Sequence, residues 1–246
     1  MGIIRDILRK NLRTSAIILA AGSSTRMGGG SKQFMEINGV PCLARTLLAF
    51  EGCRNIDDII IVAKRGEEKA CLELARAHGI TKLLRVVTGG ANRTESAMKG
   101  FSAVPEESVY VAIHDGARPL ITPLEITNVI FAAEEHKCAS AATRITDTVK
   151  KVKKDTTFVE ETLDRSHLFA VQTPQVFYRH LYEALAISAK RDEFTATDDA
   201  SIAEHYGHRV KLVETSRENI KITTPFDISL AEVILSRREK IKEDVK

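Results

Sequence analysis

The fold is set by residues 16–34, which read AIILAAGSSTRMGGGSKQF. The first five residues are apolar enough for a buried strand, and the small residues and glycines that follow end it. Similar strand-like runs recur downstream: DIIIVA at 58–63, LLRVV at 83–87, VYVAI at 109–113 and RVKLV at 209–213. Helical periodicity separates them, which predicts βαβ units. We therefore expect an α/β fold with a mostly parallel sheet and helices on both faces.

Sheets of this kind bind ligands beyond the carboxyl ends of their strands, so the loops there are the first place to look. The loop after residue 20 carries glycines at 22, 28, 29 and 30 and two cations, Arg26 and Lys32. Glycines let backbone N–H groups converge on an anion, and cations neutralise charge on a phosphoryl group. The loop has the composition of a phosphate cradle, with a purely structural turn as the alternative. Ser31 and Gln33 exclude the GxxxxGK[ST] motif, and GxGxxG is absent.

The fourth strand-like run continues into IHDGARP at 113–119, which places Asp115 at the carboxyl end of a strand. A carboxylate there can hold Mg²⁺ or a sugar hydroxyl. The alternative is structural, with Asp115 pairing with Arg118 or capping the glycine turn.

Three later clusters have similar settings. NIKIT at 219–223 predicts a short strand that carries Lys221, a cation that is either exposed or faces a ligand. In TATDDAS at 195–201, Thr197 or Asp198 is a candidate helix N-cap, and capping is also the default role for QTPQ at 172–175. Helix starts are expected at the capping box around Thr122 and at Thr224.

The pattern changes between residues 143 and 173. TVKKVKKDTTFVEETL, at 148–163, alternates apolar and charged residues around a polar turn, which predicts a protruding two-stranded ribbon. A lone hairpin is marginal in water, so a second copy of the chain is the economical partner for it. Its lysines are expected to form a solvated face. They lack the interleaved aromatic residues of a nucleic-acid site, so we expect no nucleic-acid partner.

The composition and charge of the chain limit the kinds of protein that it can be. The 246 residues carry 36 Lys and Arg against 33 Asp and Glu, a net charge of +3, and no apolar run approaches the roughly 20 residues of a membrane span. Four cysteines without CxxC spacing are expected to be buried thiols in a cytoplasmic protein. Residues 1–14 form an amphipathic extension, which we expect to pack on its own domain; contact with a membrane surface is the alternative. GxSxG, HExxH and zinc-like clusters are absent, which leaves hydrolase and metalloenzyme functions unsupported.

The ordered set LAAGSSTRMGGGSKQF, GGANRTES, HDGARP, DR before QTPQ, TDDAS and NIKIT resembles the 2-C-methyl-D-erythritol 4-phosphate cytidylyltransferases of the non-mevalonate isoprenoid pathway. The resemblance implies a Rossmann-like nucleotidyltransferase fold over residues 15–240, as a single domain with a dimerisation arm at about 144–170. It also implies CTP and a sugar-alcohol phosphate as substrates, Mg²⁺ or another divalent cation, release of pyrophosphate, and a homodimer that exchanges its arms.

The resemblance also assigns roles to individual residues. Arg26 and Lys32 would stabilise the transition state at the α-phosphate of CTP. The nucleotide would be bordered by Ala20, Ala21 and Gly22, with Gly90 and Ser96 at the cytosine. Asp115 would lie near the ribose, the metal and the acceptor. The acceptor would be positioned by Arg165, Lys221, Thr148 and Thr197, with Thr148 and Arg165 serving the neighbouring protomer.

Two positions depart from the family pattern. Ser31 stands where many relatives have proline, and Ala91 stands where some carry an acid after the double glycine, which leaves the base-side contacts open. Three other functions stay open at this point. They are a ribitol 5-phosphate cytidylyltransferase, a nucleotide-binding dimer without turnover, and a nucleic-acid binder suggested only by the lysines of the ribbon.

Overall fold

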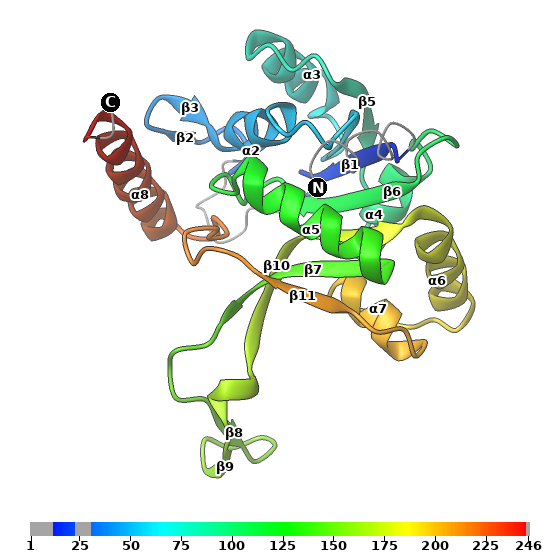
Figure 1. The fold of residues 1–246 in the computed structure, drawn as a ribbon, viewed down its shortest axis with the longest axis vertical. Coiled ribbons are helices and arrows are strands. Elements are labelled where there is room, and N and C mark those ends of the chain that lie inside the picture. Colours follow the sequence, from blue (N-terminus) through cyan, green and yellow to red (C-terminus); the bar gives the residue numbers. More distant parts are fainter. Residues whose placement is uncertain (1–11, 23–30, 245–246) are drawn as a thin grey trace.

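A twisted seven-stranded sheet forms the centre of the computed structural model, which describes residues 12–22 and 31–244 (Figure 1). The spatial order of the strands is β11-β7-β10-β6-β1-β4-β5. In chain order they are β1 (Thr14–Leu19), β4 (Asp58–Ala63), β5 (Leu83–Thr88), β6 (Tyr110–Asp115), β7 (Cys138–Arg144), β10 (Phe169–Tyr178) and β11 (Lys211–Glu214). Neighbours pair in parallel, except that β10 is antiparallel to both β6 and β7. The expected α/β fold with a mostly parallel sheet is confirmed.

The strand order reverses beside β1. The chain runs from β1 to β4 and β5 on one side, then returns to place β6 on the other side of β1. Loops that leave neighbouring strands in opposite directions leave a crevice between them, and ligands of open α/β sheets bind in such crevices. The carboxyl ends of β1 and β6 therefore mark the expected binding site.

Two layers of helices cover the sheet. One face packs on α2 (Cys42–Glu51), α3 (Glu68–Ala77) and α5 (Pro123–His136), and the other on α4 (Arg93–Phe101), α6 (Arg179–Arg191) and α7 (Asp199–His205). Alternate residues of β1 face the two layers. Ala16 and Ile18 pack on the layer of α2, α3 and α5, and Ile17 and Leu19 pack on the layer of α4, α6 and α7. A strand buried on both sides must be apolar throughout, which is the pattern its sequence shows.

Close packing also determines which residue type some helix positions can hold. A Cβ at Gly100 of α4 would lie 2.4 Å from Ile17 Cγ2 and 2.8 Å from Val62 Cγ2, so only glycine lets α4 approach the sheet this closely. The predicted capping box of α5 is present, with the Thr122 side chain and Glu125 exchanging hydrogen bonds with the backbone. Asp198, rather than Thr197, caps α7.

The last helix, α8 (Pro225–Asp244), stands beside the sheet rather than on it (Figure 1). The expected start at Thr224 is confirmed, since Asp227 Oδ2 accepts hydrogen bonds from the backbone N–H groups of Thr223 and Thr224. Its inner face joins β2 (Glu36–Ile37) and β3 (Val40–Pro41) around a small apolar cluster that includes Ile37, Ile222 and Ala231. This cluster anchors the chain on both sides of Lys221.

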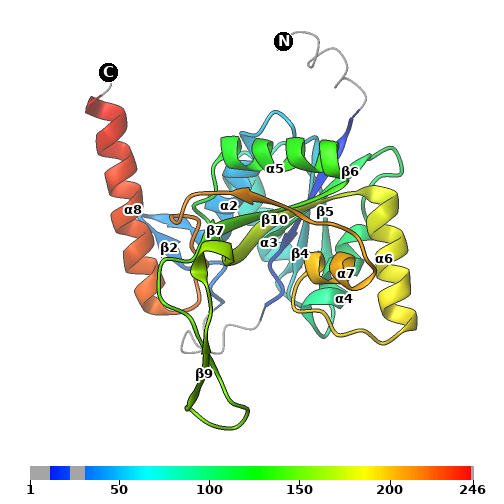
Figure 2. The ribbon, with the colours of Figure 1, turned by 60° about the horizontal axis from the view of Figure 1, so that its bottom comes forward.

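The predicted ribbon is confirmed as β8 (Lys150–Val152) paired antiparallel with β9 (Val159–Thr162). The arm, residues 145–168 between β7 and β10, leaves the sheet and protrudes from the body (Figure 2). A short 3-10 helix, Arg165–His167, lies on its return path. Phe158 near its turn is 76% exposed. Val152 and Val159, which lie on the same ribbon, are also exposed, at 46% and 54%.

One expected element is absent. Residues 219–223 were predicted as a short strand, and the prediction was wrong, because they run as an irregular segment with a single backbone hydrogen bond to the core, from Ile222 N to Ala117 O at 2.8 Å. Side-chain bonds to Asn219, described below, replace a strand ladder there.

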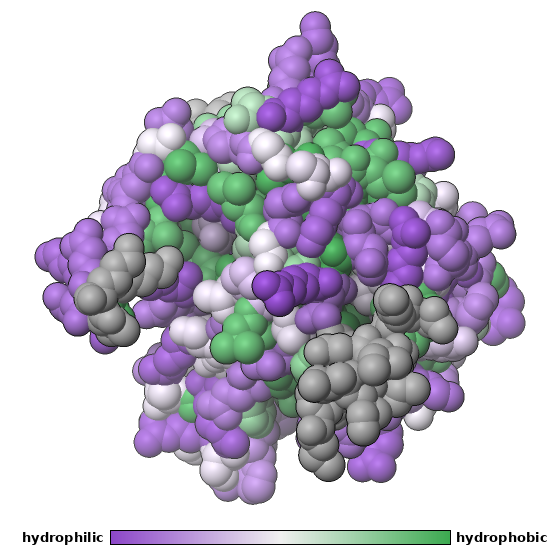
Figure 3. All heavy atoms as spheres, turned by 45° about the horizontal axis from the view of Figure 1, so that its top comes forward, coloured by the Kyte–Doolittle hydropathy of each residue, from purple (hydrophilic) through white to green (hydrophobic). Residues whose placement is uncertain are grey.

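The surface, the cysteines and the start of the chain complete the description. Hydrophilic residues surround smaller hydrophobic patches on the face shown in Figure 3. Over residues 12–22 and 31–244, the structure has no helix that is both long and apolar enough to cross a membrane. All four cysteines are free and buried, as their spacing predicted. The amphipathic extension expected at 1–14 lies outside the described residues, apart from 12–14.

Candidate active site

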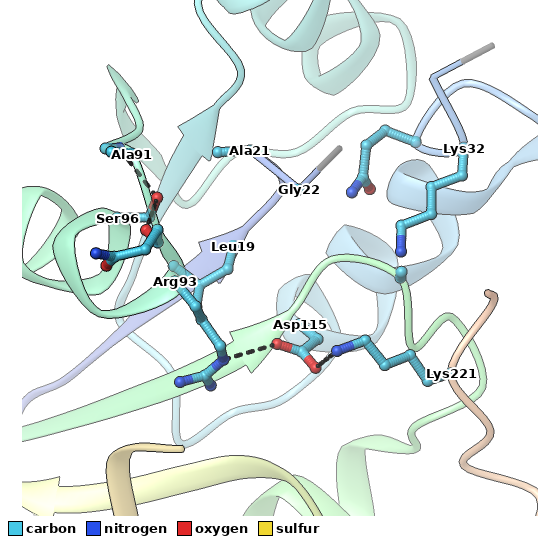
Figure 4. Close-up of a pocket in the computed structure, with 13 residues that line it drawn as sticks. Leu19, Ala21, Gly22, Lys32, Ala91, Arg93, Ser96, Asp115 and Lys221 are labelled. Atoms are coloured by element: carbon cyan, nitrogen blue, oxygen red, sulfur yellow. Dashed lines mark hydrogen bonds and ion pairs between the residues drawn. The ribbon is translucent and has the colours of Figure 1, made fainter. Parts of the chain in front are cut away.

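A cavity of about 340 Å³ opens at the carboxyl ends of β1 and β6, where the strand order reverses (Figure 4). Its walls come from the ends of those two strands, from the turn before α4, from the end of the glycine loop and from the segment before α8. The lining residues are Leu19, Ala21, Gly22, Lys32, Gln33, Gly90, Ala91, Asn92, Arg93, Ser96, Asp115, Ala117 and Lys221. Besides Asp115, the residues predicted for the site that line it are Ala21, Gly22, Lys32, Gly90, Ser96 and Lys221.

The turn between β5 and α4 forms the wall on the predicted nucleotide side. Gly90 N donates a hydrogen bond to Ser96 Oγ at 3.0 Å, and Ser96 Oγ donates to Asn92 O at 2.8 Å, so the first turn of α4 holds the loop. A Cβ at Gly89 would lie 2.4 Å from the Cβ of Ala21. The two chain segments can approach this closely only because position 89 is glycine. The result is a narrow wall of small residues.

Asp115 is the carboxylate at the centre of the cavity, and three cations surround it. Lys221 Nζ lies 2.6 Å from Oδ2, Arg93 Nε lies 3.5 Å from Oδ1, and Arg118 Nε lies 4.0 Å from Oδ2. Burial alone would raise the pKa of Asp115, but the attraction of Lys221 and Arg93 outweighs it and holds that pKa well below its ordinary value. Asp115 is therefore ionised, and its contact with Arg118 is the weakest of the three.

Two buried residues, His114 and Thr173, hold the backbone of Asp115 through a chain of hydrogen bonds. The ring Nε2 of His114 lies 3.2 Å from Arg118 O, a carbonyl that can only accept, so Nε2 carries the proton. Nδ1 then accepts from Thr173 Oγ1 at 3.0 Å, and that same oxygen accepts from Asp115 N at 3.1 Å. Burial lowers the pKa of His114 to about 3, which keeps the ring neutral and this chain of bonds intact.

Lys32 and Lys221 reach the cavity from distant parts of the chain, and Figure 4 shows both on the side of Asp115 opposite Arg93. Lys32 Nζ donates a hydrogen bond to Ile222 O at 3.2 Å, which brings it next to the segment that carries Lys221. The glycine loop is also tethered at its end, since Ser31 Oγ donates to Glu67 Oε2 at 3.2 Å. Two ammonium groups therefore border the space in front of Asp115, an arrangement suited to an oxyanion.

Buried side chains hold Lys221 in place. The amide Nδ2 of Asn219 donates to Gln172 Oε1 at 2.8 Å and to Thr173 O at 3.0 Å, and Arg118 Nη1 donates to Asn219 O at 2.7 Å. Asn219 is fully buried. QTPQ therefore braces the segment that carries Lys221, a role broader than the capping expected for it.

Arg93 is the charged residue lining the described cavity that the sequence did not identify. It is the first residue of α4, and its Nη1 lies 2.5 Å from Oδ2 of Asp199 on α7, in addition to its contact with Asp115. Burial would lower the pKa of Arg93, but the two carboxylates outweigh it and raise that pKa. Its position inside GGANRTES, directly after a turn already predicted to be functional, was the available signal.

The remaining predicted residues do not line this cavity. Ala20 is 1% exposed and lies behind the wall, with its N–H bonded to Val62 O. Thr197 is exposed just before the Asp198 cap, and Thr148 and Arg165 are exposed on the arm. Arg165 Nη1 donates to Thr146 O within the arm. Arg26 lies outside the described residues.

A divalent cation would find a single carboxylate here. Among the described residues, no group of three His, Cys, Asp or Glu side chains could hold a metal ion. Mg²⁺ often takes one or two protein carboxylates and completes its shell with substrate phosphates and water. The ionised Asp115 fits that mode, as one ligand beside a bound triphosphate.

Comparisons with known proteins identify the family of the chain. A family model described as 2-C-methyl-D-erythritol 4-phosphate cytidylyltransferase (IspD) matches residues 14–237. The chain is 41% identical over 224 residues to a protein of that name from Geobacillus thermodenitrificans, covering 91% of this chain and 97% of the relative. It is 38% identical over 229 residues to the one from Pelotomaculum thermopropionicum, covering 92% and 96%.

Solved structures give the same result. The 4-diphosphocytidyl-2C-methyl-D-erythritol synthase of Anaerococcus prevotii superposes with a TM-score of 0.83 and 32% identity, covering 92% of this chain and 100% of that one. The 2-C-methyl-D-erythritol 4-phosphate cytidylyltransferase of Thermus thermophilus gives 0.74 and 28%, covering 91% and 98%. Sequence and fold are thus shared over nearly the whole length of these proteins.

Proposed function

The chain belongs to the 2-C-methyl-D-erythritol 4-phosphate cytidylyltransferase family, and from that premise we propose how its residues divide the work. The enzyme joins CTP and 2-C-methyl-D-erythritol 4-phosphate to form 4-diphosphocytidyl-2-C-methyl-D-erythritol, and pyrophosphate leaves. The observation that carries the division of labour is the meeting of Lys32 and Lys221 in front of the ionised Asp115, in the crevice where the strand order reverses.

The chemistry asks for charge neutralisation more than for proton transfer. An oxygen of the acceptor phosphate attacks the α-phosphorus of CTP, a new P–O bond forms, and the bond from that phosphorus to the bridging oxygen of pyrophosphate breaks. Both reactants are anions, and neither the nucleophile nor the leaving group needs a proton from the protein. Alignment and electrostatic stabilisation must therefore supply most of the rate enhancement.

The nucleotide half of the site is assigned to the glycine loop and the turn before α4. Ala21 and Gly22 border the nucleotide, with Ala20 buried behind them, and Gly90 and Ser96 face the cytosine. Lys32, with Arg26 beyond the described residues, stabilises charge at the α-phosphate. The support is geometric, because the small residues leave room for a planar base and Lys32 lies at the opposite side of the same cavity.

The acceptor half is assigned to Lys221 and Asp115, with Thr197, Thr148 and Arg165. Lys221 pairs with the acceptor phosphate, while Thr148 and Arg165 come from the arm of a second protomer in a homodimer. The position of the arm supports this assignment, since Thr148 and Arg165 do not line the cavity of their own chain and the arm exposes Val152, Phe158 and Val159. A partner that takes up the arm would cover this apolar surface.

Mg²⁺ is proposed as the metal of the reaction. Asp115 is the residue that would hold it, together with the phosphates of CTP and water. Bound there, the cation would neutralise charge on the triphosphate.

Release of pyrophosphate tests the proposal directly. The purified chain is incubated with Mg²⁺, with each of the four ribonucleoside triphosphates, and with 2-C-methyl-D-erythritol 4-phosphate or ribitol 5-phosphate. We expect turnover with CTP and the methylerythritol phosphate and little with any other pair. Equal turnover with ribitol 5-phosphate would overturn the acceptor assignment, and equal turnover with UTP would overturn the role given to Gly90 and Ser96.

A further inference from the structure

Arg93 joins two carboxylates that belong to different parts of the site. We propose that it is a positioning residue, which keeps Asp115 in place when Lys221 turns from that carboxylate to the acceptor phosphate. This inference rests on the proposed function, because it assumes that Lys221 pairs with the acceptor.

The competition between two cations for Asp115 is the first observation. Lys221 contacts Oδ2 at 2.6 Å and Arg93 contacts Oδ1 at 3.5 Å, so the carboxylate is held from both sides (Figure 4). Lys221 is 40% exposed at its side chain and can reach a ligand, whereas the side chain of Arg93 is 29% exposed. Once a phosphate engages Lys221, its hold on Oδ2 weakens. Arg93 is then the stronger of the two remaining side-chain contacts, since Arg118 lies 4.0 Å away.

The anchorage of Arg93 is the second observation. Its Nη1 lies 2.5 Å from Asp199 Oδ2, and Asp199 is 1% exposed. The other oxygen of Asp199 accepts a hydrogen bond from Tyr182 Oη at 2.9 Å, and Tyr182 is itself a buried residue of α6. A guanidinium fixed at one end by a buried ion pair loses little entropy when it holds a second carboxylate at the other.

The ion pair between Arg93 and Asp199 is also connected to the first turn of α7. Asp198, next to Asp199, accepts from Gln175 Nε2 at 2.6 Å, and Gln175 Oε1 accepts from Ala200 N at 3.0 Å. Thr197, proposed to position the acceptor, immediately precedes this turn. Arg93 thus connects the turn before α4, the end of β6 and the start of α7. These elements carry residues assigned to the nucleotide and residues assigned to the acceptor.

The test is a mutant cycle on kcat/KM for the acceptor at saturating CTP. Arg93→Gln should lower this value by about 10-fold to 100-fold, because it removes one of the cations that hold the ionised Asp115. In an Asp115→Asn background the same change should cost less than about threefold, because the carboxylate that Arg93 holds is already gone. Arg93→Lys, which keeps the charge, should recover part of the loss.

A matched control separates positioning from stability. Arg13 forms a comparable bridge with Asp58 at the amino ends of β1 and β4, with Nη2 to Oδ1 at 2.7 Å. Arg13→Gln should lower the melting temperature and leave kcat/KM unchanged. Equal losses on adding Arg93→Gln to the unsubstituted chain and to the Asp115→Asn variant would overturn the proposal, as would a lower melting temperature without any change in kcat/KM.

Tyr182→Phe keeps the inference testable if Arg93→Gln does not fold. It removes the hydroxyl behind Asp199 without touching the cavity, and a fall of about threefold in kcat/KM for the acceptor is expected. An unchanged value in a folded Tyr182→Phe protein would then contradict the proposal. Failure of the function itself would look different, because the unsubstituted chain would show no turnover.

Discussion

The cavity and the arm are built in opposite ways. Around the cavity, long-range contacts hold the main charged side chains and the segment that carries Lys221: Asp115 is tied to α4 and to the segment before α8, Lys32 to Ile222, and Asn219 to β10. On the arm, polar contacts stay within the arm or at its base, and large apolar side chains face solvent, with Phe158 at 76%. The described cavity is therefore built by residues of one chain, whereas the arm exposes its side chains to solvent.

The largest expected effect lies in the cavity. Lys32→Ala should lower kcat by about 10²-fold to 10³-fold, because it removes one preorganised cation from the developing charge at the α-phosphate. Steady-state kinetics with both substrates saturating measures this. Lys82→Ala is the matched control, since Lys82 Nζ also donates to a backbone carbonyl, Cys53 O at 2.7 Å, but away from the cavity. Unchanged turnover in Lys32→Ala would remove this lysine from the mechanism.

On the arm, Arg165→Ala should raise KM for the acceptor by about 10-fold to 100-fold and leave CTP binding nearly unaltered. Separate titrations of the two substrates check the division. Lys154→Ala removes a positive charge from the same arm and serves as the control. Equal losses of affinity for both substrates would contradict the separate roles given to the cavity and the arm.

Co-expression of Lys32→Ala and Arg165→Ala chains with different tags sharpens the same comparison. If the arm serves the neighbouring protomer, a mixed dimer has one site with both residues intact, and activity returns. If the arm serves its own chain, both sites stay defective and the mixture is no more active than its components.

Gly100→Ala tests the packing beneath the cavity. The added Cβ would sit 2.4 Å from Ile17 Cγ2, so α4 must move away from the sheet, at a cost of about 1–3 kcal/mol in the free energy of unfolding. Urea denaturation measures it. Ser102→Ala, at the exposed end of the same helix, should change stability by no more than about 0.5 kcal/mol. Equal stability of the two variants would show that α4 tolerates displacement.

The smallest expected effect is at Ser31. Its hydroxyl donates to Glu67 Oε2 at 3.2 Å and tethers the glycine loop to the start of α3. Ser31→Ala and Glu67→Gln should each lower kcat by about threefold or less, because the bond is partly exposed. A much larger loss in Glu67→Gln alone would mean that Glu67 acts independently of the loop.

Much of the core could be predicted from the sequence, because β1, β4, β5 and β6 are largely apolar runs. The strands β7 and β10 carry no such signal. CASAATR in β7 is rich in alanine and serine, and QTP breaks the apolar pattern of β10, so their strand structure depends on pairing with each other. The strand predicted at 219–223 failed for the converse reason, since its apolar alternation is satisfied by the cluster under α8 and not by a neighbouring strand.

In the site, Lys32, Asp115 and Lys221 come together as the motifs predicted. Arg93 escaped prediction because an arginine in the first turn of a helix normally faces solvent, and its buried partner, Asp199, is distant in the chain. Long-range ion pairs leave no trace in local periodicity. The roles of Thr148, Arg165 and Thr197 stay predictions, because these exposed side chains lie outside the cavity of their own chain.

The antiparallel course of β10 has a mechanical consequence. The strand begins at Phe169, where the arm returns, and continues to the middle of the sheet, where the hydroxyl of Thr173 accepts the backbone N–H of Asp115. Only the extended backbone from Phe169 to Thr173 therefore separates the base of the arm from the residue that supports Asp115. A second protomer that gripped the arm, as proposed above, would therefore also pull on the backbone of Asp115, so assembly and alignment of the site would depend on the same strand.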